Sequence, residues 1–121
     1  MVRSEFVRWL VLNSICDDFE NVDQVILRDV AEGAAKCGLT VERLEVVEAL
    51  ASLIEGGFAK AYILSADSRD PFSGELQGMP PMDVIEEYFK TYFFRTKKGL
   101  ELQISDDSWW PFDDEGEPRQ D

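Results

Sequence analysis

The side chains that most often carry out enzyme chemistry are scarce in this sequence. It contains no histidine, the residue that most often transfers protons in enzymes, and only two cysteines, Cys16 and Cys37. Both cysteines lie among apolar neighbours in segments with helical patterns, which indicates reduced, buried thiols that act as small hydrophobic side chains. Two cysteines without histidine cannot form a zinc site of the usual Cys/His type within one chain.

The acidic residues do not make up for this shortage. Adjacent carboxylates occur in polar, turn-like surroundings at Asp17 and Asp18, at Asp106 and Asp107, and at Asp113 and Asp114. A two-carboxylate mechanism needs its acids in a cleft with their pKa values held apart. Near Asp113, Gly116 comes too early for the sixth position of an EF-hand calcium loop. We therefore expect no catalytic residue, no cofactor and no metal, and a chain that is not an enzyme.

Hydrophobic periodicity predicts helices through the first half of the chain. Residues 4–16 hold too many apolar side chains for a narrow stripe, so this helix should be buried over much of its circumference. A second helix, at 22–37, follows Asn21 as its cap and stops at Gly38, which adopts positive φ without strain.

A third helix, expected at residues 41–55 with Thr40 as its cap, has two sharply different sides. At about 100° per residue, its aliphatic side chains share one half of the circumference. They are Leu44, Val46, Val47, Leu50, Ala51, Leu53 and Ile54. The other half carries Glu42, Glu45, Glu48, Ser52 and Glu55. This pattern predicts a buried apolar side and a row of carboxylates that faces water.

The second half of the chain predicts strands and shorter helices. Segments 58–65 and 91–96 are rich in aromatic and branched residues and predict strands. The connection at 66–81 is long for a compact domain and is therefore expected to be either mobile or functional. Short helices are expected at 82–90 and 97–104. An enzyme of unfamiliar type would place its pocket under the long connection, beside Asp67, Arg69 and Asp70.

The composition predicts one folded domain at residues 1–105 and an acidic tail at 106–121. The net charge is −13, and the tail alone holds seven acids and one base. Its aromatic residues either fold back onto the domain or anchor a protein partner. They are Trp109, Trp110 and Phe112. Because no apolar run is long enough for a membrane span and the start lacks signal-peptide features, we expect a cytoplasmic protein without membrane contact.

The order of three helices, a strand, a long loop and a second strand resembles a winged-helix domain. Residues 47–58, VEALASLIEGGF, resemble the end of its third helix before a glycine turn, and residues 92–102, YFFRTKKGLEL, resemble the returning wing strand and a Thr-x-x-Gly turn into a helix. Bacterial regulators of the PadR and MarR type commonly carry such a pair. The resemblance covers residues 4–104 and implies an α+β fold. A three-helix core would carry a small antiparallel β-hairpin wing, with 82–90 as an extra short helix.

In that family the third helix enters the major groove of DNA. Here its exposed side would carry carboxylates, which the DNA phosphates repel. The best cationic candidates for phosphate contact are Lys90, Arg95, Lys97 and Lys98, and nearby acids indicate a mixed surface there instead. We therefore expect a non-enzymatic interaction domain that contacts a protein partner or a second copy of itself, as in a homodimer. The alternative is a DNA-binding transcriptional regulator.

Overall fold

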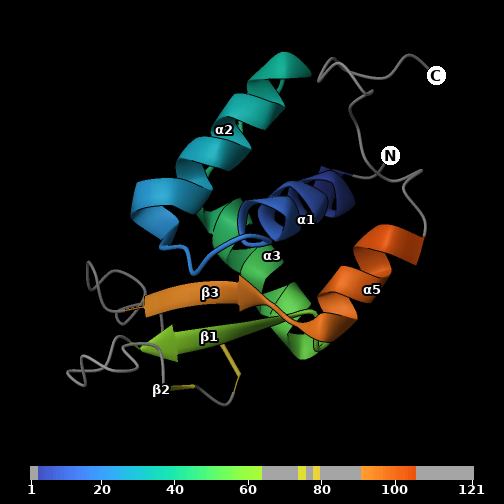
Figure 1. Ribbon diagram of the computed structural model, residues 1–121. Helices are drawn as coiled ribbons and strands as arrows, with labels where there is room; N and C mark the ends of the chain where they lie inside the picture. Colours follow the sequence, from blue (N-terminus) through green and yellow to red (C-terminus); the bar gives the residue numbers. More distant parts are fainter. Residues whose placement is uncertain (1–2, 64–73, 76–77, 80–90, 106–121) are drawn as a thin grey trace.

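The computed structural model describes residues 3–63, 74–75, 78–79 and 91–105 and shows an α+β protein (Figure 1). Its helices are α1 (Arg3–Ser14), α2 (Leu27–Lys36), α3 (Arg43–Glu55) and α5 (Lys97–Ser105), and a π-helical turn, η1 (Val22–Ile26), leads into α2. Its strands are β1 (Ala59–Ile63), β2 (Gly74–Glu75) and β3 (Thr91–Arg95). The helix expected at 82–90 and the acidic tail at 106–121 lie outside the described residues.

The strands form one antiparallel sheet in the order β2-β1-β3. β1 pairs with β3 along its whole length, with Ala61 opposite Phe93. These two strands confirm those predicted from the sequence. The short strand β2 was not predicted: it lies within the long connection and pairs with Tyr62 and Ile63 at the end of β1.

The hydrophobic core lies between the helices and one face of the sheet. Figure 1 shows α1, α2 and α3 on one side of the sheet and α5 beside its end. Because successive strand residues point to opposite faces, Ala59 and Ala61 turn inward from β1 and Phe93 from β3. α1 is buried over much of its circumference, as predicted. Its buried side chains are Phe6, Val7, Trp9, Leu10, Val11 and Leu12.

The segment between α1 and η1 closes the outer edge of β3. Glu20 exchanges two backbone hydrogen bonds with Phe93, at 2.9 and 3.0 Å. The Arg95 N–H donates to the Ile15 carbonyl at 3.1 Å. An open strand edge is a site for unwanted pairing with another chain, so these bonds protect β3 on the side that β1 does not cover.

Asn21 begins the second helical segment, as the sequence predicted. Its side-chain oxygen accepts a hydrogen bond from the Asp23 N–H at 3.0 Å, which satisfies one of the free donors at a helix start. Its side-chain NH₂ donates to the Thr91 carbonyl at 3.0 Å. Asn21 is 2% exposed, so a single buried side chain connects the helix start to β3. The helix ends before Gly38, which has a φ of 72°, again as predicted.

α3 differs from its prediction in its cap and in its buried side. The cap is Glu42 and not Thr40: the Glu42 N–H donates to the Glu45 carboxylate at 3.2 Å in a capping box. Leu44, which the periodicity placed in the apolar half, is 54% exposed. Ala49 is buried instead, because α1 packs along that side of α3 and a small residue lets the two helices approach closely.

Candidate functional site

The outward side of α3 carries Leu44, Glu48, Ala51 and Glu55 on successive turns, and we call these four residues the α3 face. Leu44, Glu48 and Glu55 are exposed, and Ala51 is half-buried. Residues three and four apart are neighbours on a helix surface, so the four side chains form one continuous stripe. The stripe contains no lysine or arginine. It presents a leucine and two carboxylates to solvent.

Glu45, another glutamate of the predicted acidic row, is turned toward α1. Its carboxylate accepts two hydrogen bonds from the Arg3 guanidinium, at 2.8 and 3.0 Å, and Arg3 also donates to the Thr40 carbonyl. The hydrogen bond from Arg3 and then that from the Glu42 N–H lower the pKa of Glu45 below its usual 4.5. The same ion pair raises the pKa of Arg3. Glu45 is thus a structural residue, while Glu42 at the cap is exposed.

The Arg3–Glu45 pair makes a prediction about pH. A carboxyl whose pKa is lowered by folding contributes stability above its unfolded pKa, near 4.5, and loses it as the pH falls through the folded value. We expect Glu45→Gln to lower the melting temperature slightly at pH 7, because exposed ion pairs contribute little. The difference from the parent chain should shrink below pH 4.5. Thermal unfolding measured across this range tests it, with Glu48→Gln as the unpaired control. A constant difference would contradict the pairing.

A groove of about 360 Å³ runs between α1 and α3, and we call it the α1–α3 groove. α1 contributes Arg3, Ser4, Val7 and Arg8, and α3 contributes Glu45, Glu48, Ala49 and Ser52. Val7 and Ala49 are 2% and 7% exposed and form an apolar floor. Arg8 crosses the groove and donates to the Ser52 hydroxyl at 3.2 Å. Glu48 makes no ion pair or hydrogen bond with any described residue.

Arg43, the basic residue of the first turn of α3, is also engaged. Its guanidinium donates to both carboxylate oxygens of Asp23, at 2.7 and 3.2 Å. The two side chains are each 28% exposed, so the pair lies partly within the surface. The arginines nearest to the start of α3, Arg3 and Arg43, are therefore both neutralised by carboxylates of the same molecule.

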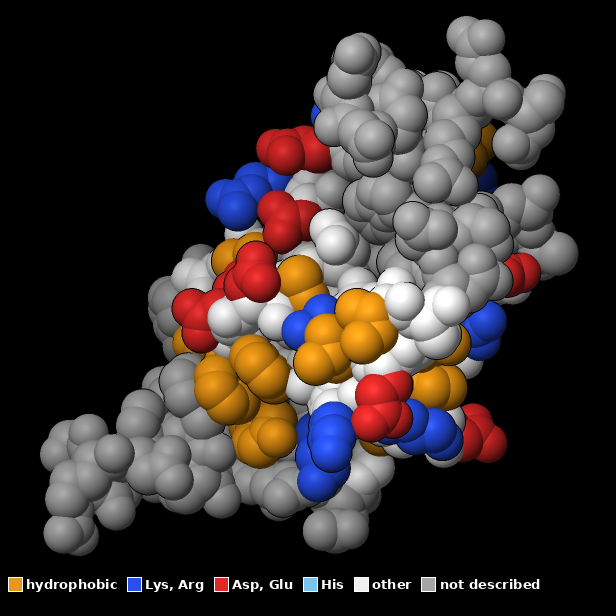
Figure 2. Space-filling view, turned by 45° about the vertical axis from the view of Figure 1, so that its right-hand side comes forward, with side chains coloured by type: hydrophobic (Ala, Val, Ile, Leu, Met, Phe, Trp, Pro, Cys, Tyr) orange, Lys and Arg blue, Asp and Glu red, His pale blue; other side chains and the backbone are white. Residues whose placement is uncertain are grey.

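Two of the cationic candidates for phosphate contact, Arg95 and Lys98, are engaged within the molecule. Lys98 donates to the Gly56 carbonyl at 2.7 Å, at the end of α3, and lies 4.8 Å from the centre of the Phe58 ring. Arg95 donates to Gln103. Lys97 is exposed, and Lys90 lies outside the described residues. Figure 2 shows the lysine and arginine side chains of this side of the molecule separated by hydrophobic and acidic ones.

The two cysteines are free thiols. The sequence predicted that both are buried, whereas the structure shows both half-buried. Burial, followed by the charge of Asp17, raises the pKa of Cys16, and burial raises that of Cys37. A raised thiol pKa keeps the sulfur protonated near neutral pH, and the thiolate is the nucleophilic form. Neither cysteine therefore resembles a catalytic nucleophile.

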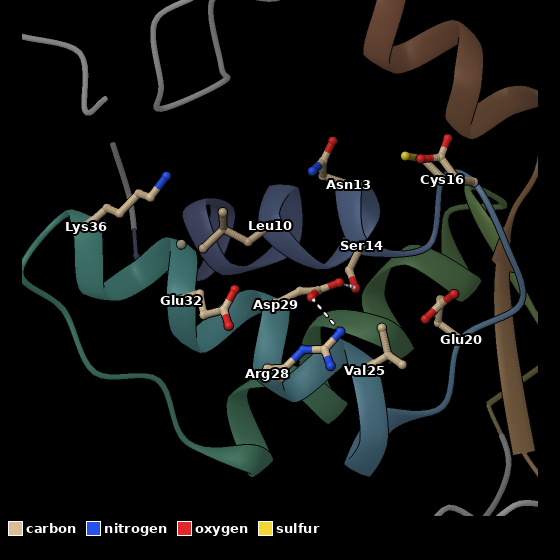
Figure 3. A pocket seen from close by; sticks show the side chains of 12 residues that line it. Leu10, Asn13, Ser14, Cys16, Glu20, Val25, Arg28, Asp29, Glu32 and Lys36 are labelled. Carbon is tan, nitrogen blue, oxygen red and sulfur yellow. Dashed lines mark hydrogen bonds and ion pairs between the residues drawn. The ribbon is translucent and has the colours of Figure 1, made fainter. Parts of the chain in front are cut away.

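A larger groove, of about 670 Å³, lies between α1 and α2 (Figure 3). The Ser14 hydroxyl donates to the Asp29 carboxylate across it at 2.8 Å, and Arg28 lies 3.5 Å from the same carboxylate. Burial, and then the charges of Asp18 and Asp29, raise the pKa of Glu20 on its rim. Its walls carry charges of both signs, with Lys36 and Glu32 at one end (Figure 3). This mixture defines no single ligand chemistry.

The sequence-based reasoning missed Arg3, Arg8 and the exposure of Leu44. A usable signal exists for the arginines: on a helix that is buried nearly all round, the few charged positions must lie where it meets a neighbour. Leu44 stands at the edge of the apolar half, where a small rotation of the buried side brings it into solvent. The tail aromatic residues, expected either to fold back or to anchor a partner, lie outside the described residues: Trp109, Trp110 and Phe112.

No protein-family model, no curated protein and no solved structure matches this chain. In the part of the chain that the structure describes, no helix is long and apolar enough to cross a membrane. Within that same part, no three histidine, cysteine or acidic side chains are grouped to hold a metal ion. The exposure, hydrogen bonds and charges described above make the α3 face, together with the α1–α3 groove, the candidate site.

Proposed function

We propose that this chain is a non-enzymatic interaction domain of winged-helix type whose α3 face binds a protein partner. The order of its helices and strands supports the resemblance, since three helical segments precede β1 and the second long strand, β3, leads into α5. The Thr96 hydroxyl accepts from the Gly99 N–H at 3.1 Å, as in a Thr-x-x-Gly turn. In this proposal residues 1–105 form the domain and 106–121 an appended acidic tail.

The exposure of Leu44 carries the proposal. A leucine that is 54% exposed lies one turn from Glu48, on the same stripe as Glu55, on the helix that would face a ligand in such a domain. Leu39, in the turn before α3, is a second exposed leucine, at 38%. Protein interfaces join a central apolar contact to a polar rim, whereas a DNA surface needs neither an exposed leucine nor carboxylates.

The alternative, a DNA-binding regulator, is less well supported by the electrostatics. Affinity for DNA comes largely from lysines and arginines that neutralise phosphates and release counterions. The α3 face has none, and Arg3 and Arg43 beside it are engaged by Glu45 and Asp23. Self-association through this face would bring the glutamates of two copies together. A partner segment that combines basic and apolar side chains is the complement that fits.

A peptide selection tests this function directly. A library of random peptides displayed on phage, selected on the immobilised full chain, is expected to yield binders rich in lysine or arginine and bulky apolar residues. Leu44→Asp should weaken those binders by about tenfold or more, because a central apolar anchor is replaced by a further negative charge. Affinity is measured by fluorescence anisotropy, and circular dichroism checks that the variant is folded.

Ile104→Asp is the matched control, since Ile104 is an apolar residue that is 73% exposed on α5, away from the α3 face. It should leave peptide affinity unchanged. A selection without binders, or binders that lose equal affinity with both variants, would refute the proposed surface. Retention of duplex DNA on filters at low salt would favour the DNA-binding alternative instead.

A further inference from the structure

The α1–α3 groove has features that the α3 face alone does not explain. Hydrogen-bonded contacts cross it at two points along its length: Arg3 to Glu45 and Arg8 to Ser52. Between these contacts the floor is apolar, formed by Val7 and Ala49. Such a slot accepts the flexible aliphatic part of a side chain that arrives from outside.

The charges around the α1–α3 groove indicate which charge the end group of that side chain carries. Glu48 lines the groove, is exposed and has no ionic partner among the described residues. Glu45 is already paired with Arg3, and Arg8 is turned to Ser52. The charged lining of the groove is Arg3, Arg8, Glu45 and Glu48, and Glu42 lies near Arg3, so the acids exceed the arginines by one. The local potential therefore attracts a cation and leaves Glu48 free to receive it.

From this geometry we infer that the α1–α3 groove is the pocket for one lysine side chain of the partner. Its methylene groups lie on Val7 and Ala49, and its ammonium group donates to the Glu48 carboxylate. A long alkyl stem with a charged tip suits an apolar slot with an acid at its rim. The inference rests on the proposed function, because the lysine belongs to the segment that binds the α3 face. It adds the position and chemistry of the contact that anchors this segment.

The probe for the test is lysine with both backbone ends blocked, N-acetyl-lysine N-methylamide, titrated into the ¹⁵N-labelled full chain. Blocked norleucine, which has a similar stem without the charge, and blocked glutamate are compared with it. We expect a saturable, millimolar interaction that shifts the amide signals of Val7, Glu48 and Ala49. Norleucine should bind about tenfold more weakly, and glutamate should give no saturable shift.

Glu48→Gln removes the charge and keeps the shape of the side chain, so it should weaken lysine binding by about tenfold. Glu101→Gln is the matched control: it removes the same charge from an exposed glutamate of α5 that lies outside both the groove and the α3 face, and lysine binding should be unchanged. Equal binding by the parent chain and Glu48→Gln, shifts confined to other residues, or no saturable shift would overturn the inference.

The two proposals fail in different ways. If peptides bind in a Leu44-dependent manner while blocked lysine does not enter the groove, the α3 face remains a binding surface and the lysine pocket is wrong. If blocked lysine binds at Glu48 while no peptide depends on Leu44, the pocket exists and the proposed protein-binding face is wrong.

Discussion

Replacing Gly99 by alanine is expected to lower the free energy of unfolding by about 3 kcal/mol, in the range of severe overpacking. Gly99 is buried at the start of α5, and a Cβ there would lie 2.4 Å from the Phe58 carbonyl oxygen and 2.7 Å from Cγ of Arg95. The carbonyl cannot move freely, because it accepts a hydrogen bond from the Thr96 N–H at 3.0 Å. A denaturant titration measures this free energy, and thermal unfolding should show a melting temperature lower by about 10 °C.

Gly38→Ala provides the contrast to this variant. Gly38 has a φ of 72°, but beyond its chain neighbours no heavy atom of the described residues lies within 4 Å of the added Cβ, so backbone strain is what opposes the change. That strain costs about 1 kcal/mol. If Gly99→Ala were no less stable than Gly38→Ala, the close packing of α5 against the turn after α3 would be refuted.

The contacts of this turn show what a short motif reveals and what it hides. Thr96 and Gly99 predict a turn into a helix, and α5 begins at Lys97 as expected. The motif does not reveal that the Thr96 hydroxyl also donates to the Gly57 carbonyl at 2.6 Å. Nor does it reveal that Lys98 reaches the carbonyl of Gly56. A positive charge is favourable at the negative end of a helix, so Lys98, which the alternative function would place on phosphate, here stabilises the end of α3.

The orientation of α3 shows a second limit of the sequence. Its period of 3.6 residues defines which side chains share a side, and Val46, Leu50 and Leu53 are buried accordingly. The apolar side of α3 is wide, and the period does not define which part of it the neighbouring helix contacts. α1 packs over Ala49, and the buried side turns away from Leu44. The residue on which the proposed function depends was therefore the one that periodicity placed wrongly.

The sequence predicts the total charge of the surface but not which charged residues pair with each other. The net charge of −13 and the glutamates of α3 indicated an acidic surface. Two charged residues of α3, Glu45 and Arg43, pair with residues that are distant in the sequence. Glu45 pairs with Arg3, 42 residues away, and Arg43 pairs with Asp23, 20 residues away. Such pairs follow from tertiary packing, which a local pattern does not encode. Because of them, the arginines beside α3 are occupied, while Glu48 has no partner among the residues that the structure describes.

Asn21→Ala is expected to lower the free energy of unfolding by about 3 kcal/mol. Loss of the cap to the Asp23 N–H accounts for about 1 kcal/mol. The Thr91 carbonyl also loses its buried hydrogen bond from Asn21, which costs about 2 kcal/mol more. Chemical unfolding measures the sum. Asn13→Ala, on the exposed side of α1, is the control and should change stability by less than about 0.5 kcal/mol.

Asn21→Asp separates the two roles of this side chain, because aspartate also caps a helix but, when ionised, cannot donate a hydrogen bond. Burial and the facing Thr91 carbonyl should raise the pKa of the new carboxyl above its usual value of about 3.9. A group whose pKa rises on folding stabilises the protein at low pH and loses that contribution as the pH increases through the folded value. The variant should therefore be destabilised at pH 7 at least as much as Asn21→Ala, and should approach the parent chain as the pH falls. If Asn21→Asp were as stable as the parent chain at pH 7, the helix cap alone would matter, and the connection from Asn21 to β3 would carry no energetic weight.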